Sequence, residues 1–125
     1  MLSDSEAIAM IAVKDINAAT KFYEGTLGLS RLSTEGDEAI TYRTGSFRLN
    51  IYRSQYAGTN KATSVLWNVG KDIEAVVANL KSKGISFEHY DMPEMKLEGD
   101  IYRHADFKVA WFKDPDGNIL SIVNE

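Results

Sequence analysis

Cysteine is absent from this 125-residue sequence, which excludes disulfides, thiol nucleophiles, thiolate metal sites and iron–sulfur clusters. No apolar run approaches the roughly 18 residues of a membrane span. The opening MLSDSEAIAM also lacks the basic and long apolar regions of a signal peptide. The formal net charge of −4 is mild, and the basic stripe typical of DNA-binding domains is missing. We therefore expect a cytoplasmic protein with neither a membrane nor a nucleic-acid partner.

The first half of the chain predicts one helix and four strands. The apolar run 7–13 indicates a buried strand, and Asp15 after it is a good N-cap for a helix. The buried stripe of that helix is expected at Ala18, Phe22 and Leu27. Gly28 can end the helix in the left-handed conformation. Turn signals then separate three strand-like stretches, at 29–35, 38–44 and 46–53.

The second half repeats this order after a small, polar stretch, 54–62, that is typical of a linker. A helix is expected at 71–84, and strands are expected at 64–69, 85–91, 106–113 and 118–124. The connection 91–106 is long and contains Pro93 and Gly99. Such a connection is a lid over a binding site, a partner surface or a merely exposed loop.

The two halves also resemble each other in sequence. DINAATKFYEGTLGLS (15–30) lines up with DIEAVVANLKSKGIS (72–86) with one residue deleted. Neither copy can bury its sheet alone, so the two should pack together. We therefore predict a single domain, 1–125, built from module one at about 5–53, a linker at about 54–62 and module two at about 63–125.

Two motifs resemble those of a known family. Asp-Ile-x-x-Ala-x-x-Phe-Tyr-x-x-x-Leu-Gly-Leu at 15–29 and Asp-Pro-Asp-Gly-Asn at 114–118 are together similar to the vicinal oxygen chelate superfamily. That group includes glyoxalase I, bleomycin-resistance proteins and extradiol dioxygenases. The resemblance implies an α+β fold, in which two βαβββ modules form a curved, eight-stranded, cup-like mixed sheet with helices on its outer face. The second motif itself predicts a β-turn, with Pro115 pre-setting φ and Gly117 taking a positive φ.

The resemblance also implies four cup-facing positions that hold a divalent metal in many members. By alignment to the strand–helix junctions they fall on Ile8, Asn50, Ser64 or Val65, and Ser121. None of these is a carboxylate or an imidazole, and a divalent metal needs several such donors. We therefore predict a member of the superfamily that lacks the metal ligands, with no metal and no cofactor.

Strand alternation predicts which side chains line the cup instead. Phe47, Leu49 and Ile51 form one apolar face, as do Val65, Trp67 and Val69, and helices should cover both faces. The opposite faces then supply the predicted ligand-binding residues: Met10, Arg48, Asn50, Tyr52, Ser64, Asn68, Trp111 and Ser121.

Each of these residues also has a plain structural interpretation. Arg48, Asn50 and Tyr52 fit a solvated sheet face as well as a cup. Ser64 and Ser121 fit ordinary strand ends, and Trp111 fits either the core or a pocket wall. His89 and His104 map to no ligand position, and no catalytic residue can be named.

Three functions remain open at this point. The first is metal-free binding of a small neutral or anionic organic molecule, as in drug-resistance-like members, because Arg48 rather than a carboxylate cluster faces the cup. The second is a lyase, isomerase or dioxygenase of the same superfamily. The third is a structural dimer whose cup is filled by its own side chains. The family resemblance also implies a homodimer.

Overall fold

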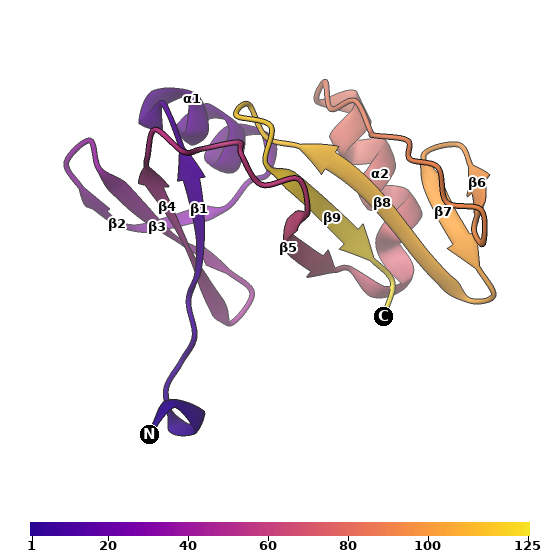
Figure 1. Ribbon diagram of the computed structural model, residues 1–125, viewed down its shortest axis with the longest axis horizontal. Helices are drawn as coiled ribbons and strands as arrows, with labels where there is room; N and C mark the ends of the chain where they lie inside the picture. Colours follow the sequence, from indigo (N-terminus) through magenta and orange to yellow (C-terminus); the bar gives the residue numbers. More distant parts are fainter. The chain divides into compact units, whose positions relative to one another are not determined.

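The computed structural model describes residues 1–125, which separate into two compact units, Met1–Thr59 and Asn60–Glu125 (Figure 1). The boundary between the units falls inside the polar stretch 54–62. Each unit contains helices and a mixed sheet, so the predicted α+β class is confirmed. No helix in either unit has the length and apolar character needed to cross a bilayer.

The first unit contains a four-stranded sheet in the order β1-β4-β3-β2. Its elements are η1 (Leu2–Asp4), β1 (Ala9–Val13), α1 (Ile16–Thr20), the π-helix η2 (Lys21–Thr26), β2 (Ser30–Glu35), β3 (Ala39–Thr44) and β4 (Phe47–Arg53). The pairing of β1 with β4 is parallel, because α1 and η2 form a crossover after β1, and the other pairings are antiparallel.

The helix of the first unit begins as predicted and then widens. Asp15 is the N-cap, and its carboxylate accepts a hydrogen bond from the Asn17 amide at 2.9 Å. From Lys21 the helix continues as a π-helix, in which the Leu27 amide donates to the Phe22 carbonyl five residues back. Gly28 follows with φ of +75°.

This wider turn changes the buried stripe of the helix. The buried residues are Ala19, Phe22 and Tyr23, whereas Ala18 and Leu27 are only half-buried. The prediction of Leu27 was wrong because it assumed an α-helical period throughout, and a π-turn carries more residues per turn. The prediction of Ala18 was wrong for a different reason, since in α1 itself the neighbouring Ala19 is the residue that faces the core.

One face of the first sheet packs beneath this helix. Tyr23 of η2 stacks on Tyr42 of β3 with ring centroids 6.3 Å apart. The strand residues buried with them are Ile11, Val13, Ile40, Leu49 and Ile51. Phe47, predicted to share this face, is 69% exposed because it lies at the very start of β4.

The second unit contains a five-stranded sheet in the order β5-β9-β8-β7-β6. Its elements are β5 (Thr63–Asn68), η3 (Gly70–Asp72), α2 (Ile73–Ser82), β6 (Lys96–Glu98), β7 (Ile101–His104), β8 (Phe107–Lys113) and β9 (Ile119–Val123). The helix α2 lies over the sheet in Figure 1 and buries Ile73, Val77 and Leu80. Leu120 and Phe112 are the matching buried strand residues.

The segment 85–107 differs from the prediction. Residues 85–91 do not form a strand, because their only ladder contact is an isolated bridge from Glu88 to Trp111. The expected loop 91–106 instead contains the hairpin β6–β7, and β7 pairs with β8 through Tyr102 and Val109. The chain therefore has nine strands in two hydrogen-bonded sheets rather than eight in one. The register pairs β7 only with the start of β8, Phe107–Val109, and 85–91 meets the same edge further along, at the single bridge from Glu88 to Trp111.

Candidate functional site

The polar face of the first sheet lies opposite its helix. On this face Met10 of β1 and Thr41 of β3 are the direct neighbours of Asn50 on either side. Tyr52, two residues further along β4, lies between Ala12 and Ala39. The structure thus brings the predicted residues Met10, Asn50 and Tyr52 together on one face of one sheet.

Asn50 has an incomplete set of hydrogen bonds. Its Nδ2 donates to Thr41 Oγ1 at 3.1 Å, while its Oδ1 is buried and has no partner. A buried polar atom without a partner costs about 1–3 kcal/mol. The amide oxygen is therefore an unused acceptor, which a donor group of a bound molecule would reach only after a neighbouring side chain moves.

Arg48, by contrast, already has a partner. Its Nε and Nη2 donate to the Glu6 carboxylate at 3.3 and 3.2 Å, and the Arg48 side chain is 49% exposed. Exposed pairs of this kind contribute about 0–1 kcal/mol. An incoming anion could displace Glu6, but Arg48 is not an unoccupied donor.

The predicted residues of the second unit have different surroundings. Ser121 is 1% exposed and lies between Leu66 and Trp111 in the sheet register. Asn68 is exposed, and its Oδ1 accepts a hydrogen bond from the Gly70 amide at 3.1 Å, which is a turn-capping contact. Exposed Ser64 accepts a 3.4 Å hydrogen bond from Asn60, at a shift in the register of β5.

Trp111 lines a pocket of about 330 Å³ within the second unit, which we call the Trp111 pocket. Its lining residues are Lys61, Ala62, Thr63, Tyr90, Trp111 and Ile119. Trp111 Nε1 donates to Thr63 Oγ1 at 3.2 Å, and the rings of Tyr90 and Tyr102 contact the indole edge-to-face at 5.5 and 5.4 Å. These contacts fix the orientation of the indole.

Tyr90 is held in the pocket wall through its backbone. Its amide donates to Tyr102 Oη, and Tyr102 Oη donates to the Tyr90 carbonyl at 2.7 Å. Burial, followed by the charge of Glu88, raises the pKa of the Tyr90 hydroxyl. Tyr90 is therefore a neutral hydrogen-bonding group at physiological pH.

The segment after Tyr90 covers part of the same sheet face. Met92 and Met95 pack with Trp111 against a buried cluster of Tyr102, Val109 and Val123. Unbranched methionines fill irregular gaps and adapt to new contacts. This part of the long connection is thus packed on the sheet beside the Trp111 pocket.

Sequence reasoning named Trp111 but missed several of its neighbours. Lys61 and Thr63 lie in or next to the stretch read as a linker, and Tyr90 lies in the segment read as a strand. Alternation along a strand cannot indicate which loop residues approach it. The only feature of the sequence that could have indicated these neighbours was the aromatic character of 85–91.

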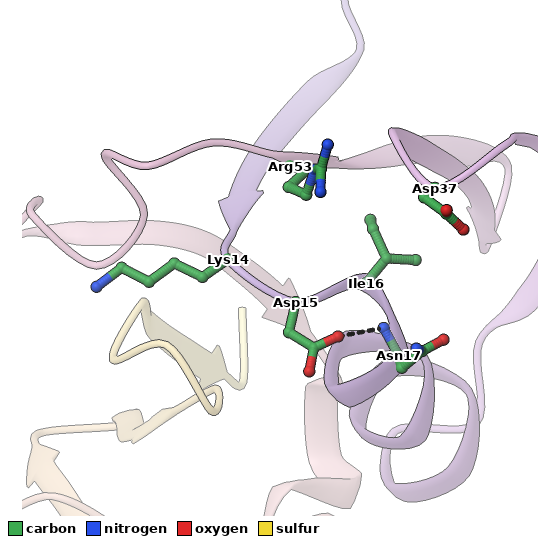
Figure 2. A pocket seen from close by; sticks show the side chains of 6 residues that line it. All are labelled: Lys14, Asp15, Ile16, Asn17, Asp37 and Arg53. Atoms are coloured by element: carbon green, nitrogen blue, oxygen red, sulfur yellow. Dashed lines mark hydrogen bonds between the residues drawn. The ribbon is translucent and has the colours of Figure 1, made fainter.

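A second, more polar pocket of about 220 Å³ lies in the first unit (Figure 2). Its lining residues are Lys14, Asp15, Ile16, Asn17, Asp37 and Arg53. The Asp15 carboxylate caps the helix, as the dashed line in Figure 2 shows, and Arg53 pairs with Glu38 at 2.6 Å. Charges of both signs mix here and the principal groups are engaged, so this pocket is the weaker candidate.

Both histidines serve to anchor the hairpin segment. His89 Nε2 and Lys81 Nζ contact the two oxygens of Asp100 at 2.8 and 2.7 Å, at the turn between β6 and β7. Lys81 and then His89 hold the pKa of Asp100 below its usual value. His104 Nδ1 lies 3.1 Å from the Glu94 carbonyl. Neither histidine lines the Trp111 pocket.

An ionic cluster also lies beside the π-helix η2 of the first unit. The Glu24 carboxylate accepts hydrogen bonds from Arg31 and from the Tyr42 hydroxyl, the latter at 2.9 Å. Burial, assisted by Glu24, raises the pKa of Tyr42 to about 12, and Arg31 lowers the pKa of Glu24. Since Tyr42 is fully buried, this cluster is structural.

The residues at the four inferred metal positions do not fit a divalent ion. Ile8 and Val65 offer no donor atom, and Asn50, Ser64 and Ser121 offer only neutral oxygens. The structure also contains no group of three or more His, Cys, Asp or Glu side chains that could hold a metal. These positions therefore provide no ligand set for metal-dependent chemistry.

The fold and this arrangement define an α+β protein with paired strand-helix-sheet units. Residues 7–122 match the family model described as the Glyoxalase/Bleomycin resistance protein/Dioxygenase superfamily, and the chain belongs to that superfamily. This confirms the resemblance noted from the sequence.

Solved structures with the same fold come from several sources. One is an integron cassette protein from the mobile metagenome of the Halifax Harbour sewage outfall (17% identity, 97% of this chain and 98% of that chain, TM-score 0.72). Another is lactoylglutathione lyase from Agrobacterium tumefaciens (13% identity, 95% of this chain and 92% of that chain, TM-score 0.71). A third is the fosfomycin resistance protein FosX from Mesorhizobium loti (10% identity, 98% of this chain and 92% of that chain, TM-score 0.69). At these identities the likeness establishes the fold only.

Proposed function

We propose that this protein binds a small neutral or anionic organic molecule without using a metal, as a glyoxalase/bleomycin-resistance-like binding protein. The observation that carries the proposal is the Trp111 pocket, which combines an aromatic wall with a few polar groups. Small-molecule sites in proteins are typically apolar concavities of about 300–1,000 Å³ with a small number of placed polar groups. At about 330 Å³ the pocket fits this description for a compact ligand.

The polar face of the first sheet supports the same function independently. The unpartnered Asn50 oxygen is a buried acceptor, to which a ligand would supply the missing hydrogen bond once a neighbouring side chain has moved. Exposed Met10 next to it offers an adaptable apolar contact. The predicted ligand residues Arg48, Asn50, Tyr52, Ser64, Asn68, Ser121, Met10 and Trp111 remain the proposal for ligand contacts.

The metal-free part of the proposal rests on donor chemistry. Enzymes of this superfamily that use a metal need carboxylate or imidazole ligands, and the inferred positions supply none. A lyase, isomerase or dioxygenase is the alternative function, and it would need a metal held by other residues or a metal-free mechanism.

One combined experiment separates these functions. Purified protein is dialysed and analysed for zinc, nickel, manganese and iron, and then screened by thermal shift against small organic molecules with and without added metal. We expect far less than one metal equivalent and a rise in melting temperature with some neutral or anionic compounds. One equivalent of bound metal, together with turnover of a compound from the screen, would favour the enzyme. A screen in which no compound raises the melting temperature would favour the structural dimer.

The proposal includes a homodimer, which rests on the family resemblance. Light scattering at micromolar concentration should give twice the chain mass. A monomer mass would remove this part of the proposal.

A further inference from the structure

We infer that the Trp111 pocket selects flat aromatic anions, such as aryl carboxylates, over neutral or aliphatic molecules of the same size. This inference rests on the proposed binding function and narrows it to a class of ligand. Three features of the pocket carry it: the geometry of its rings, the single charge on its rim and the donor capacity of Thr63.

The rings form a corner. Tyr90 and Trp111 meet at an interplanar angle of 77° with their centroids 5.5 Å apart. A flat aromatic guest can therefore stack on one ring while it meets the other edge-to-face, which are the two favoured geometries of aromatic pairs. A saturated ring is thicker and gains neither contact. Ile119 and Ala62 complete an apolar surface around the guest.

The lining of the pocket carries one charge, and the nearby Glu88, which acts on the Tyr90 hydroxyl from outside the lining, is paired with Lys113. Lys61 is the charged residue among the six that line it, and Lys61 makes no ion pair in the structure. Other lysines of the same unit are engaged: Lys81, Lys96, Lys108 and Lys113 each pair with a carboxylate. No carboxylate lines the pocket, so a cationic ligand would find no partner while an anionic one meets Lys61.

Thr63 adds a directional donor. Its oxygen accepts the indole N–H of Trp111, which leaves the hydroxyl hydrogen to donate. A carboxylate within reach of Thr63 and Lys61 would accept from both groups. An uncharged amide in the same place would accept more weakly, because charge-assisted hydrogen bonds are the stronger ones.

The experiment compares three probes that differ in one property each: 2-naphthoate, 2-naphthamide and decahydro-2-naphthoate. Binding is followed by the indole N–H signal of Trp111 in a proton–nitrogen correlation spectrum. The chain has two tryptophans, so the spectrum of Trp67→Phe assigns the Trp111 signal. Should Trp67→Phe fail to fold, loss of the signal in Trp111→Phe makes the same assignment.

We expect 2-naphthoate to bind about tenfold or more tightly than either other probe. Lys61→Gln should weaken 2-naphthoate about three- to tenfold and leave 2-naphthamide unchanged. It should also abolish the loss of 2-naphthoate affinity that added salt causes in the parent, because that loss reflects a screened charge pair. Lys71→Gln removes the same charge from a residue outside the pocket, and it should change nothing.

The two proposals fail in distinguishable ways. Equal affinity for all three probes, or equal weakening of naphthoate and naphthamide by Lys61→Gln, overturns the aromatic-anion inference while binding itself stands. No shift of the Trp111 signal with any probe, together with a silent thermal-shift screen, overturns both.

Discussion

The turn between β8 and β9 is organised around one buried carboxylate, and its removal should destabilise the second unit. Asp114 is 5% exposed. Its Oδ1 accepts from the Asp116 and Asn118 amides, both at 2.9 Å, and its Oδ2 accepts from Asn118 Nδ2 at 2.8 Å. The Gly117 amide closes the turn on the Asp114 carbonyl at 3.0 Å, and Gly117 has φ of +87°, as the sequence predicted.

The magnitude follows from the donors that Asp114→Ala would leave behind. The Asp116 amide is only partly buried and can turn to water, but Asn118 is 4% exposed, so its backbone amide and Nδ2 would both lose the Asp114 acceptor where water cannot replace it. Each stranded buried donor costs about 1–3 kcal/mol. We therefore expect Asp114→Ala to lower the free energy of unfolding by about 2–5 kcal/mol. Asp114→Asn keeps one acceptor oxygen and should cost less.

Urea unfolding followed by tryptophan fluorescence is the suitable assay. Both tryptophans, Trp67 and Trp111, lie in the second unit, so the signal reports the unit that contains the turn. Asp91→Ala is the matched control, because Asp91 is exposed, and it should stay within about 0.5 kcal/mol of the parent. If Asp114→Ala is no less stable than this control, the carboxylate does not hold the turn and the reasoning fails.

Three further predictions concern other polar groups. Asp15→Ala should cost about 1 kcal/mol by removing the N-cap of the first unit, measured by urea unfolding followed by far-ultraviolet circular dichroism, and an unchanged midpoint would contradict that role. Because Lys81 and His89 depress the pKa of Asp100, the stability that Asp100 contributes is present above its unfolded-state pKa and is lost as pH falls through the folded-state pKa. The difference in urea midpoint between parent and Asp100→Asn should therefore close on acidification, and a pH-independent difference would argue against it. Asn50→Leu should keep or raise stability, because it removes the unpartnered oxygen, while it weakens ligands that contact the polar face of the first sheet; unchanged affinity for every ligand found in the screen would remove Asn50 from the proposed contacts.

Most of the fold was predictable because the local preferences for strands, helix caps and turns agree with the pattern of buried apolar residues. The apolar run before Asp15, the N-cap itself and the turn at 114–118 each have one physically favoured structure, and each appears in the molecule. The segment 85–104 was not predictable in the same way. The stretch 85–91 has strand composition, but β7 and 85–91 share one edge of β8, and only tertiary pairing decides which of them forms a ladder there.

The candidate site was predictable only where strands supply it. Alternation indicated that Asn50 and Met10 share a face, and the sheet register places them side by side. Alternation could not indicate that the side-chain oxygen of Asn68 caps a turn. Nor could it indicate that Lys61 and Tyr90, which lie outside the strands, approach Trp111.

The π-helix η2 accounts for the one-residue difference between the two repeated segments. From Asp15 to Gly28 the first copy is one residue longer than the second is from Asp72 to Gly84, yet both glycines have positive φ, at +75° and +95°. After each glycine the next amide closes the helix end: Ile85 bonds to Leu80 five residues back, whereas Leu29 bonds to Tyr23 six residues back. The surplus residue is thus absorbed as a wider turn inside the helix, and the chain leaves both helices through the same kind of glycine exit. A change of length that would displace every following side chain in a strand is here confined to a single turn.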